Sequence, residues 1–250
     1  MKKLVFGLSF IVLTASIITA CKKHESSPGE TLEDLKLRVE SNLDIPGTVH
    51  NKSLSIAFED LNKIDISSYS ESEILEVSKA SIINNLYDFT SGVLSKEEIT
   101  NFISSCENNS LEKNTTPQTN LIIQYSNEFK NVIDSLSTIE EYNTKINEIV
   151  NIASLEQDIE TETLNTIIAI ASVAKNSNEY WYNNSNDWYN LLNFEKKPKP
   201  GFEDRIIEAD IEGAVQGGLT GLVGGWVGGA IGALLGSPVA SAWQGITEYN

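Results

Sequence analysis

The sequence predicts an all-α protein, an irregular multi-helix bundle with a glycine-rich C-terminal helix packed in or against it. Apolar residues recur at three- and four-residue steps through most of the chain, and no stretch of any length alternates apolar with polar residues. A third observation is a run of glycines between residues 213 and 236 that is spaced by four. At 250 residues the chain is long enough to bury a core.

The first twenty residues predict a cleaved export signal. Lys2 and Lys3 precede an apolar run from Leu4 to Ile18, which is short for a membrane span and fits the central region of a signal peptide. The next residues, Thr19-Ala20-Cys21, resemble a lipobox, which implies cleavage before Cys21 and lipid on its sulfur. We therefore expect a palmitate-bearing lipoprotein of the cell envelope, held in the outer membrane. The alternative is an ordinary signal peptide in which Cys21 is incidental.

Acidic side chains dominate the chain, with 35 Asp and Glu against 18 Lys and Arg, for a net charge of −17. Loss of Lys2 and Lys3 with the signal would take this charge to −19. Phosphate binding needs clustered basic residues, so the composition argues against nucleic acid as a partner. It argues equally against electrostatic adhesion to anionic lipid, so the membrane contact is expected through lipid on Cys21.

Five segments follow from the pattern in order. Residues 1–20 are the signal, and residues 21–30 form a polar, flexible tether. A helical domain is expected at 31–194, a proline- and lysine-rich linker at 195–201, and a glycine-rich helical segment at 202–250.

Within the helical domain, residues 31–43 are weakly amphipathic and residues 45–48, Ile-Pro-Gly-Thr, predict a turn. Helical periodicity then begins at 52–64 and returns repeatedly, with a polar connector at 107–118 and the most apolar helix at 159–181.

Two capping boxes mark helix starts within this domain. In Ser95-x-x-Glu98 and Thr138-x-x-Glu141, a hydroxyl and a carboxylate can satisfy free backbone N–H groups.

The glycine-rich segment holds two rows of glycine at a step of four, which predicts one helix over 213–236 with two small-residue faces. Its ten glycines cost about 10 kcal/mol of helix propensity, so close approach of another helix must offset that cost. A stop at Gly236 and a new helix start at Pro238 are expected after it. The helix-packing residues are expected to be Gly213, Gly217, Gly221, Gly225 and Gly229 in one row, with Gly224, Gly228 and Gly232 in the other.

This helix leaves three interpretations open. It can be a central helix enclosed by the bundle, a helix that inserts into a bilayer as part of a pore, or a flexible tail. The regular spacing argues most strongly against the tail.

Side chains with chemical potential are few. His50 beside Asn51 could bind a ligand or sense pH, but capping of the helix at 52–64 is the favoured interpretation. Trp181 and Trp188, in a cluster of aromatic residues, could form a carbohydrate platform, although closure of a bundle end is commoner. Cys106 is expected to be a small, partly buried residue.

Catalytic and metal-binding motifs are missing from the sequence. It has no His-Glu-x-x-His, Cys-x-x-Cys, Gly-x-Ser-x-Gly or phosphate-binding glycine loop. Asp60, Asn62 and Glu71 match a calcium loop poorly, because Ile64 and Asp65 stand where a ligand and a glycine are wanted. We therefore expect no enzyme activity, no metal and no cofactor.

Two resemblances add to these observations. Gly213 to Gly236 resembles the glycine zippers of small outer-membrane lipoproteins and of some pore-forming bacteriocins. The lipobox and the motif Gly47-x-x-His50-Asn51-x-x-Leu54, followed by helices and a glycine-rich end, resemble a group of uncharacterised Bacteroidota lipoproteins. The second resemblance spans most of the chain and implies an envelope location without a particular activity.

A non-enzymatic envelope lipoprotein with a structural or interaction role is the function that the sequence favours. It would contact a protein partner, or itself, through the glycine-rich helix. A membrane-active, bacteriocin-like or pore-forming effector is the alternative, and a carbohydrate- or peptide-binding surface lipoprotein is the second alternative. Burial of the glycine-rich helix would favour the first of these, and an exposed apolar face would favour the pore.

Overall fold

The computed structural model describes residues 29–108, 116–133, 138–192, 201–224 and 227–247, and the predictions for Cys21, Gly225 and the signal segment lie outside these ranges. The described chain is helical and contains no strand, which confirms the predicted all-α class. Among the described helices, none has both the length and the apolarity that crossing a membrane requires.

Nine α-helices and one short 3-10 turn make up the described chain. They are α2 (Leu32–Ser41), α3 (Ile45–Leu61), η1 (Ile66–Ser68), α4 (Glu71–Thr90), α5 (Lys96–Asn108), α6 (Pro117–Ile133), α7 (Ile139–Ala153), α8 (Thr161–Leu192), α9 (Phe202–Gly224) and α10 (Gly229–Thr247).

Helix starts follow the local sequence closely. The predicted box at Ser95 is confirmed, since its amide and hydroxyl both donate to Glu98 Oε2 and its Oγ accepts from the Glu98 amide. Thr138 caps α7 by accepting from the Glu141 amide at 3.1 Å. Each such cap satisfies an N–H group that the helix itself cannot bond.

The turn predicted at residues 45–48 is wrong, because these residues form the first turn of α3. Pro46 suits that position, where no intrahelical N–H bond is required. Gly47 is needed for a different reason: a Cβ there would overlap the Ser172 carbonyl oxygen of α8. Its amide instead donates to Ser172 Oγ at 3.1 Å, so glycine allows α3 and α8 to approach closely.

The single helix predicted over 213–236 is also wrong. The chain breaks after α9 and turns back at Gly228, whose φ of +74° is a left-handed conformation that glycine adopts readily. The second helix, α10, then runs through Pro238, where a stop and a new start were predicted. Folding back allows the two glycine-rich stretches to pack against each other, and we call this α9–α10 pair the glycine hairpin.

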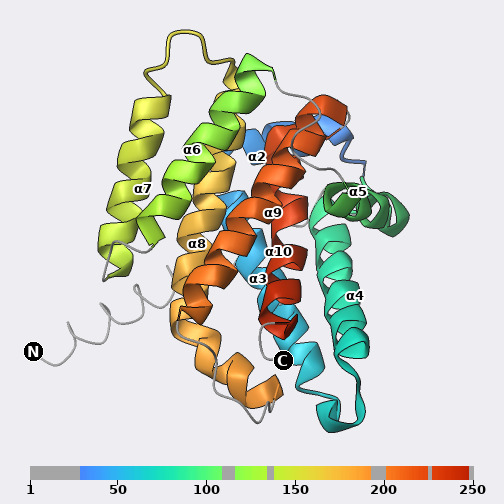
Figure 1. Ribbon diagram of the computed structural model, residues 1–250. Helices are drawn as coiled ribbons and strands as arrows, with labels where there is room; N and C mark the ends of the chain where they lie inside the picture. The colour runs from blue at the N-terminus through green and yellow to red at the C-terminus, as the bar shows by residue number, and fades with distance from the viewer. Residues whose placement is uncertain (1–28, 109–115, 134–137, 193–200, 225–226, 248–250) are drawn as a thin grey trace, which may run out of the picture.

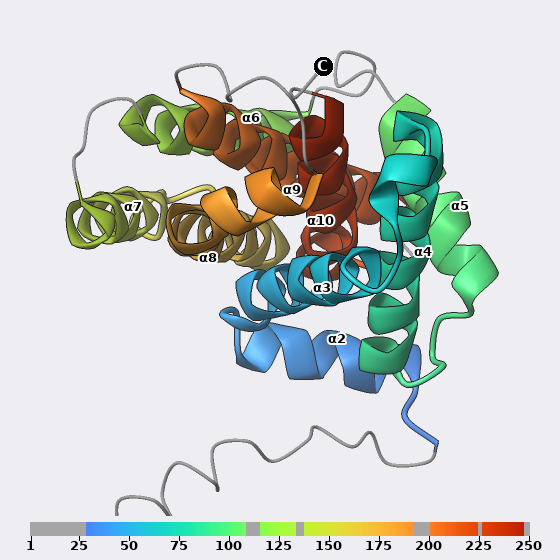
Figure 2. The same cartoon turned by 90° about the horizontal axis from the view of Figure 1, so that it is seen from below.

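The glycine hairpin lies inside the bundle. In two perpendicular views α10 is surrounded by other helices (Figures 1 and 2), and it contacts α2, α3, α4, α5, α8 and α9. The helices α6 and α7 lie beyond α8 and α9, to the left of the hairpin in Figure 1. Apolar side chains from the first described helix to the last form one continuous core, so the hairpin is part of that core.

Candidate functional site

The two helices of the hairpin meet glycine to glycine. A Cβ on Gly217 would overlap the carbonyl oxygen of Gly232, and a Cβ on Gly232 would overlap the carbonyl oxygen of Gly217. On either side of this pair, Gly213 faces Gly236 and Gly221 faces Gly228 in the same way. The backbones therefore touch along three successive helical turns, at a separation that no larger residue allows.

Some predicted packing glycines have other surroundings. Gly229 packs against Thr166 of α8, because a Cβ there would overlap its hydroxyl. Gly224 is exposed at the end of α9, and Gly225 lies outside the described residues. Gly236, which belonged to the second row but was not among the expected packing residues, packs against Gly213.

A buried polar cluster joins the hairpin to two other helices. His50 of α3 and Asp210 of α9 are both fully buried, and His50 Nε2 lies 3.0 Å from Asp210 Oδ1. Asp210 Oδ2 accepts from Ser177 Oγ at 2.6 Å and from Trp181 Nε1 at 3.2 Å. Trp181 Nε1 also lies 3.1 Å from Ser241 Oγ of α10. The cluster thus links α3, α8, α9 and α10.

The contacts of His50 identify its protonation state. Asn51 Nδ2 donates to the Asn176 carbonyl at 2.9 Å, so Asn51 Oδ1 faces His50 Nδ1 at 3.0 Å and accepts from it. The other ring nitrogen, Nε2, faces the Asp210 carboxylate and has no other partner among the described residues. Because both nitrogens face acceptors, His50 is an imidazolium paired with a carboxylate.

Electrostatics agree with this assignment. Burial by itself lowers the pKa of His50, but the negative charge of Asp210 and the hydrogen bonds from Asp210 and Asn51 outweigh burial and raise the pKa above its ordinary value. An ion pair inside the core is costly to form and very costly to break once formed.

The cluster contains Ser, His and Asp side chains without the order that hydrolysis requires. A catalytic serine donates to histidine, whereas Ser177 donates to Asp210. All three side chains are buried, so no substrate reaches them. The expected role of His50 as a cap before the helix at 52–64 is wrong, because His50 lies within α3. Its role is to tie α3 to the hairpin.

The aromatic residues predicted as an alternative carbohydrate platform are mostly buried. Trp181 and Trp188 are 1% and 2% exposed, and their rings lie 5.7 Å apart. Trp188 Nε1 donates to the Tyr180 hydroxyl at 2.9 Å. Both tryptophans therefore fill the core, as the commoner interpretation expected, and only Tyr182 of the cluster is well exposed, at 68%.

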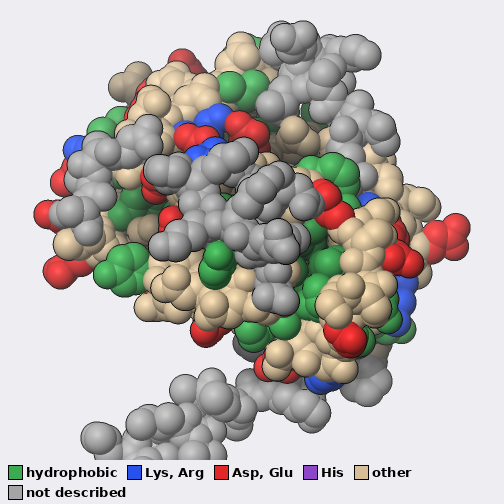
Figure 3. Space-filling view, turned by 60° about the horizontal axis from the view of Figure 1, so that its bottom comes forward, with side chains coloured by type: hydrophobic (Ala, Val, Ile, Leu, Met, Phe, Trp, Pro, Cys, Tyr) green, Lys and Arg blue, Asp and Glu red, His purple; other side chains and the backbone are tan. Residues whose placement is uncertain are grey.

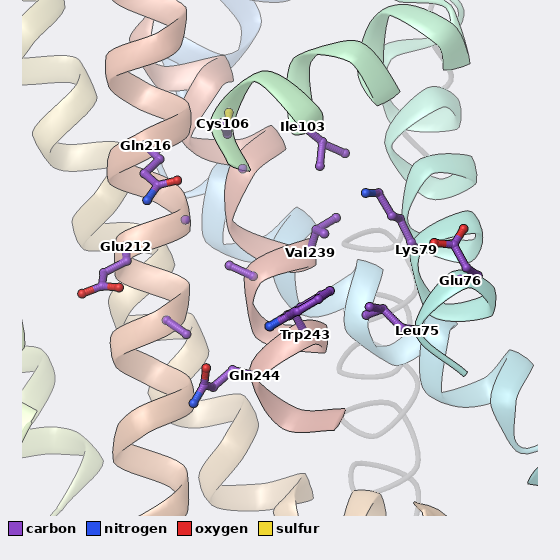
Figure 4. A pocket seen from close by; sticks show the side chains of 14 residues that line it. Leu75, Glu76, Lys79, Ile103, Cys106, Glu212, Gln216, Val239, Trp243 and Gln244 are labelled. Atoms are coloured by element: carbon purple, nitrogen blue, oxygen red, sulfur yellow. The ribbon is translucent and has the colours of Figure 1, made fainter. Parts of the chain in front are cut away.

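A groove of about 540 Å³ lies over the outer side of the hairpin, between α9, α10, α4 and α5. Figure 4 shows Trp243 extending from α10 toward Leu75 of α4, with Glu212 and Gln216 of α9 on the opposite side. Small residues form its floor, including Gly213 and Gly236 of the central glycine contacts. Trp243 is 53% exposed, which is unusual for so large an apolar side chain.

Cys106 and Ile103 close the α5 end of this groove. Cys106 is buried, in agreement with its expected role as a small core residue. Lys79 and Glu76 of α4 lie at the opposite wall and give that side both signs of charge. The groove is thus apolar at its base and polar at its margin, as binding sites usually are.

Sequence reasoning missed the partner of His50 and the importance of Trp243. The signal for Asp210 was present: an acid stands among Ile206, Ile207, Ile211 and Ala214, on the face that the apolar residues bury. An acid on a buried face requires a partner, and His50 is the one histidine within the described residues. Trp243 had no comparable signal, because its exposure depends on where α4 and α5 pass.

Metal binding has no support among the described residues, where no three His, Cys, Asp or Glu side chains gather as ligands. Comparison of the chain with protein-family models, with curated proteins and with solved structures found no match.

Proposed function

We propose that this chain is a non-enzymatic lipoprotein of the cell envelope that acts as an interaction protein. Lipid on Cys21 would hold it at a membrane, and the helical domain would present the groove beside Trp243 to a partner protein. The observation that carries this proposal is the groove itself, an apolar depression with a half-exposed tryptophan on a rigid floor. Buried tryptophans are typical energetic centres of protein interfaces.

The expected partner is a protein segment with an apolar side chain flanked by Lys or Arg. The apolar base of the groove, with Leu75, Val239 and Trp243, suits the apolar side chain. The chain has a net charge of −17, and Figure 3 shows more acidic than basic side chains on the face it displays. Complementary charge speeds association and selects partners, so basic flanks are favoured.

The pore-forming alternative receives no support from the hairpin. From Gly229 to Val239 every residue of α10 is buried, so no apolar helix face is available to a bilayer. Self-association through the glycines is also disfavoured, because they already contact one another within the chain. The buried arrangement supports the enclosed-helix interpretation, in which the glycines build a thin, rigid scaffold for the groove.

A photo-crosslinking residue at position 243 tests the proposal in cells that make the full-length lipoprotein. A discrete protein adduct should form at 243 and not at Leu155, which is 79% exposed on the loop after α7 and serves as the control. In isolated membranes, added NaCl should reduce the adduct if basic flanks contribute. An absent adduct, or an equal one at both positions, would contradict the groove as the partner site.

A further inference from the structure

A second, smaller cavity of about 350 Å³ lies between α7, α8 and α9, on the other side of the hairpin from the groove. It shares no lining residue with that groove. Its volume falls within the range of about 300–1,000 Å³ that is usual for small-molecule sites. Its walls are polar, with two amides, Asn178 and Asn186, beside the hydroxyl of Ser185.

Tyr142 is the feature of this cavity that packing does not explain. It lines the cavity and is 3% exposed, yet its hydroxyl has no hydrogen-bond partner among the described residues. Nearly all buried hydroxyls in folded proteins have a partner, which is a protein group, a water or a ligand. Burial raises the pKa of Tyr142, so its hydroxyl keeps its proton and can both donate and accept.

The remaining walls narrow the class of ligand. Carboxylates of Glu203 and Asp204 line the cavity and no Lys or Arg does so among the described residues, which argues against an anion. An apolar ligand would leave the amides without partners. At the cavity edge, the ring of Tyr182 is exposed and offers an apolar face. Hydroxyls, amides and carboxylates beside an exposed ring suit a molecule with many hydroxyl groups and one apolar face.

We propose that this cavity binds a neutral saccharide unit. Tyr142, Asn178 and Asn186 hydrogen-bond its hydroxyl groups, and Tyr182 covers the apolar face of its ring. Tyr142 is a binding residue, and its hydroxyl gains in the complex the partner that it lacks in the unbound chain. The proposal is independent of the groove, because neither site needs the other to be occupied.

Saturation-transfer NMR on the purified full-length protein, in a sugar-free detergent, tests this assignment. The probes are glucose, galactose, N-acetylglucosamine and their disaccharides, with ethanolamine as a cationic comparison. At least one saccharide should bind, and Tyr142→Phe should weaken that binding about tenfold, as expected for one lost hydrogen bond in a buried site.

Tyr125→Phe is the matched control, since Tyr125 is also buried but its hydroxyl donates to Glu156 at 2.9 Å, on other helices. This variant should leave saccharide binding unchanged and lower the Tm, whereas Tyr142→Phe should not lower the Tm. Tyr182→Ala, on the exposed side chain, gives a second variant that should weaken binding without affecting folding.

Three results would overturn the proposal: no saccharide binds the unaltered protein, binding is the same in Tyr142→Phe, or ethanolamine binds while the saccharides do not. The last result would identify a site for a cationic amine. Failure of the crosslink at position 243 would leave the saccharide result unaffected, so the two proposals fail separately.

Discussion

Replacement of Gly217 by alanine tests the central structural claim, that backbone contact holds the glycine hairpin together. The added Cβ would overlap the carbonyl oxygen of Gly232, and it would lie 2.8 Å from the carbonyl carbon of that residue and 3.1 Å from Gly236 Cα. All three are backbone atoms, so no side chain can rotate out of the way. The helices α9 and α10 must separate to accept the methyl group.

The magnitude follows from two opposing terms. Alanine favours a helix interior over glycine by about 1 kcal/mol. Inserting a methyl group into a filled core costs about 1–3 kcal/mol, and the backbone contacts place Gly217 at the upper end of that range. Gly245→Ala is the matched control in the same hairpin. Its Cβ would lie 3.7 Å from Trp181 and 3.8 Å from Ile206, which is ordinary contact, so only the favourable term remains.

Urea and thermal unfolding of both variants, followed by helical circular dichroism, measure the difference. Gly217→Ala should be less stable than the unaltered protein, and Gly245→Ala should be equally stable or more stable. The two variants should differ by about 3 kcal/mol, or roughly 6–12 °C in Tm for a chain of this size. If Gly217→Ala proves as stable as Gly245→Ala, the backbones do not meet as described, and the glycines have another purpose.

Further predictions concern the buried ion pair, one cap and the lipid anchor. Asp210→Asn leaves the His50 imidazolium without its counter-charge, so we expect a loss of about 3 kcal/mol in unfolding free energy by urea titration. The pKa of His50 is raised in the folded state, so its stabilising contribution is complete below its unfolded value of 6.5 and is lost as the pH rises through the folded pKa. The unfolding free energy should therefore decline above pH 6.5, and the decline should be absent in Asp210→Asn. Ser95→Ala removes the cap on the Glu98 amide and should cost about 1 kcal/mol in the same titration, with little dependence on pH. Cys21→Ser should move the protein from the membrane fraction to the soluble fraction, and an unchanged membrane-bound pool would rule out the lipid anchor.

Local sequence patterns were enough to predict the helical class and several helix starts. Periodicity at three- and four-residue steps depends only on which face of a helix is buried, and the cap at Ser95 depends only on residues three apart. The spacing of the glycines correctly indicated a close helix contact, because ten glycines would otherwise oppose helix formation.

The partner of each buried face was decided only by the tertiary structure. A row of glycines shows that a backbone comes near and does not identify which one, so the turn at Gly228 and the pairing of Gly217 with Gly232 were not predicted. His50 and Asp210 are far apart in the chain, and only the packing of α3 against the hairpin makes them an ion pair. Periodicity describes one helix at a time, whereas a contact between helices depends on the path of the chain between them.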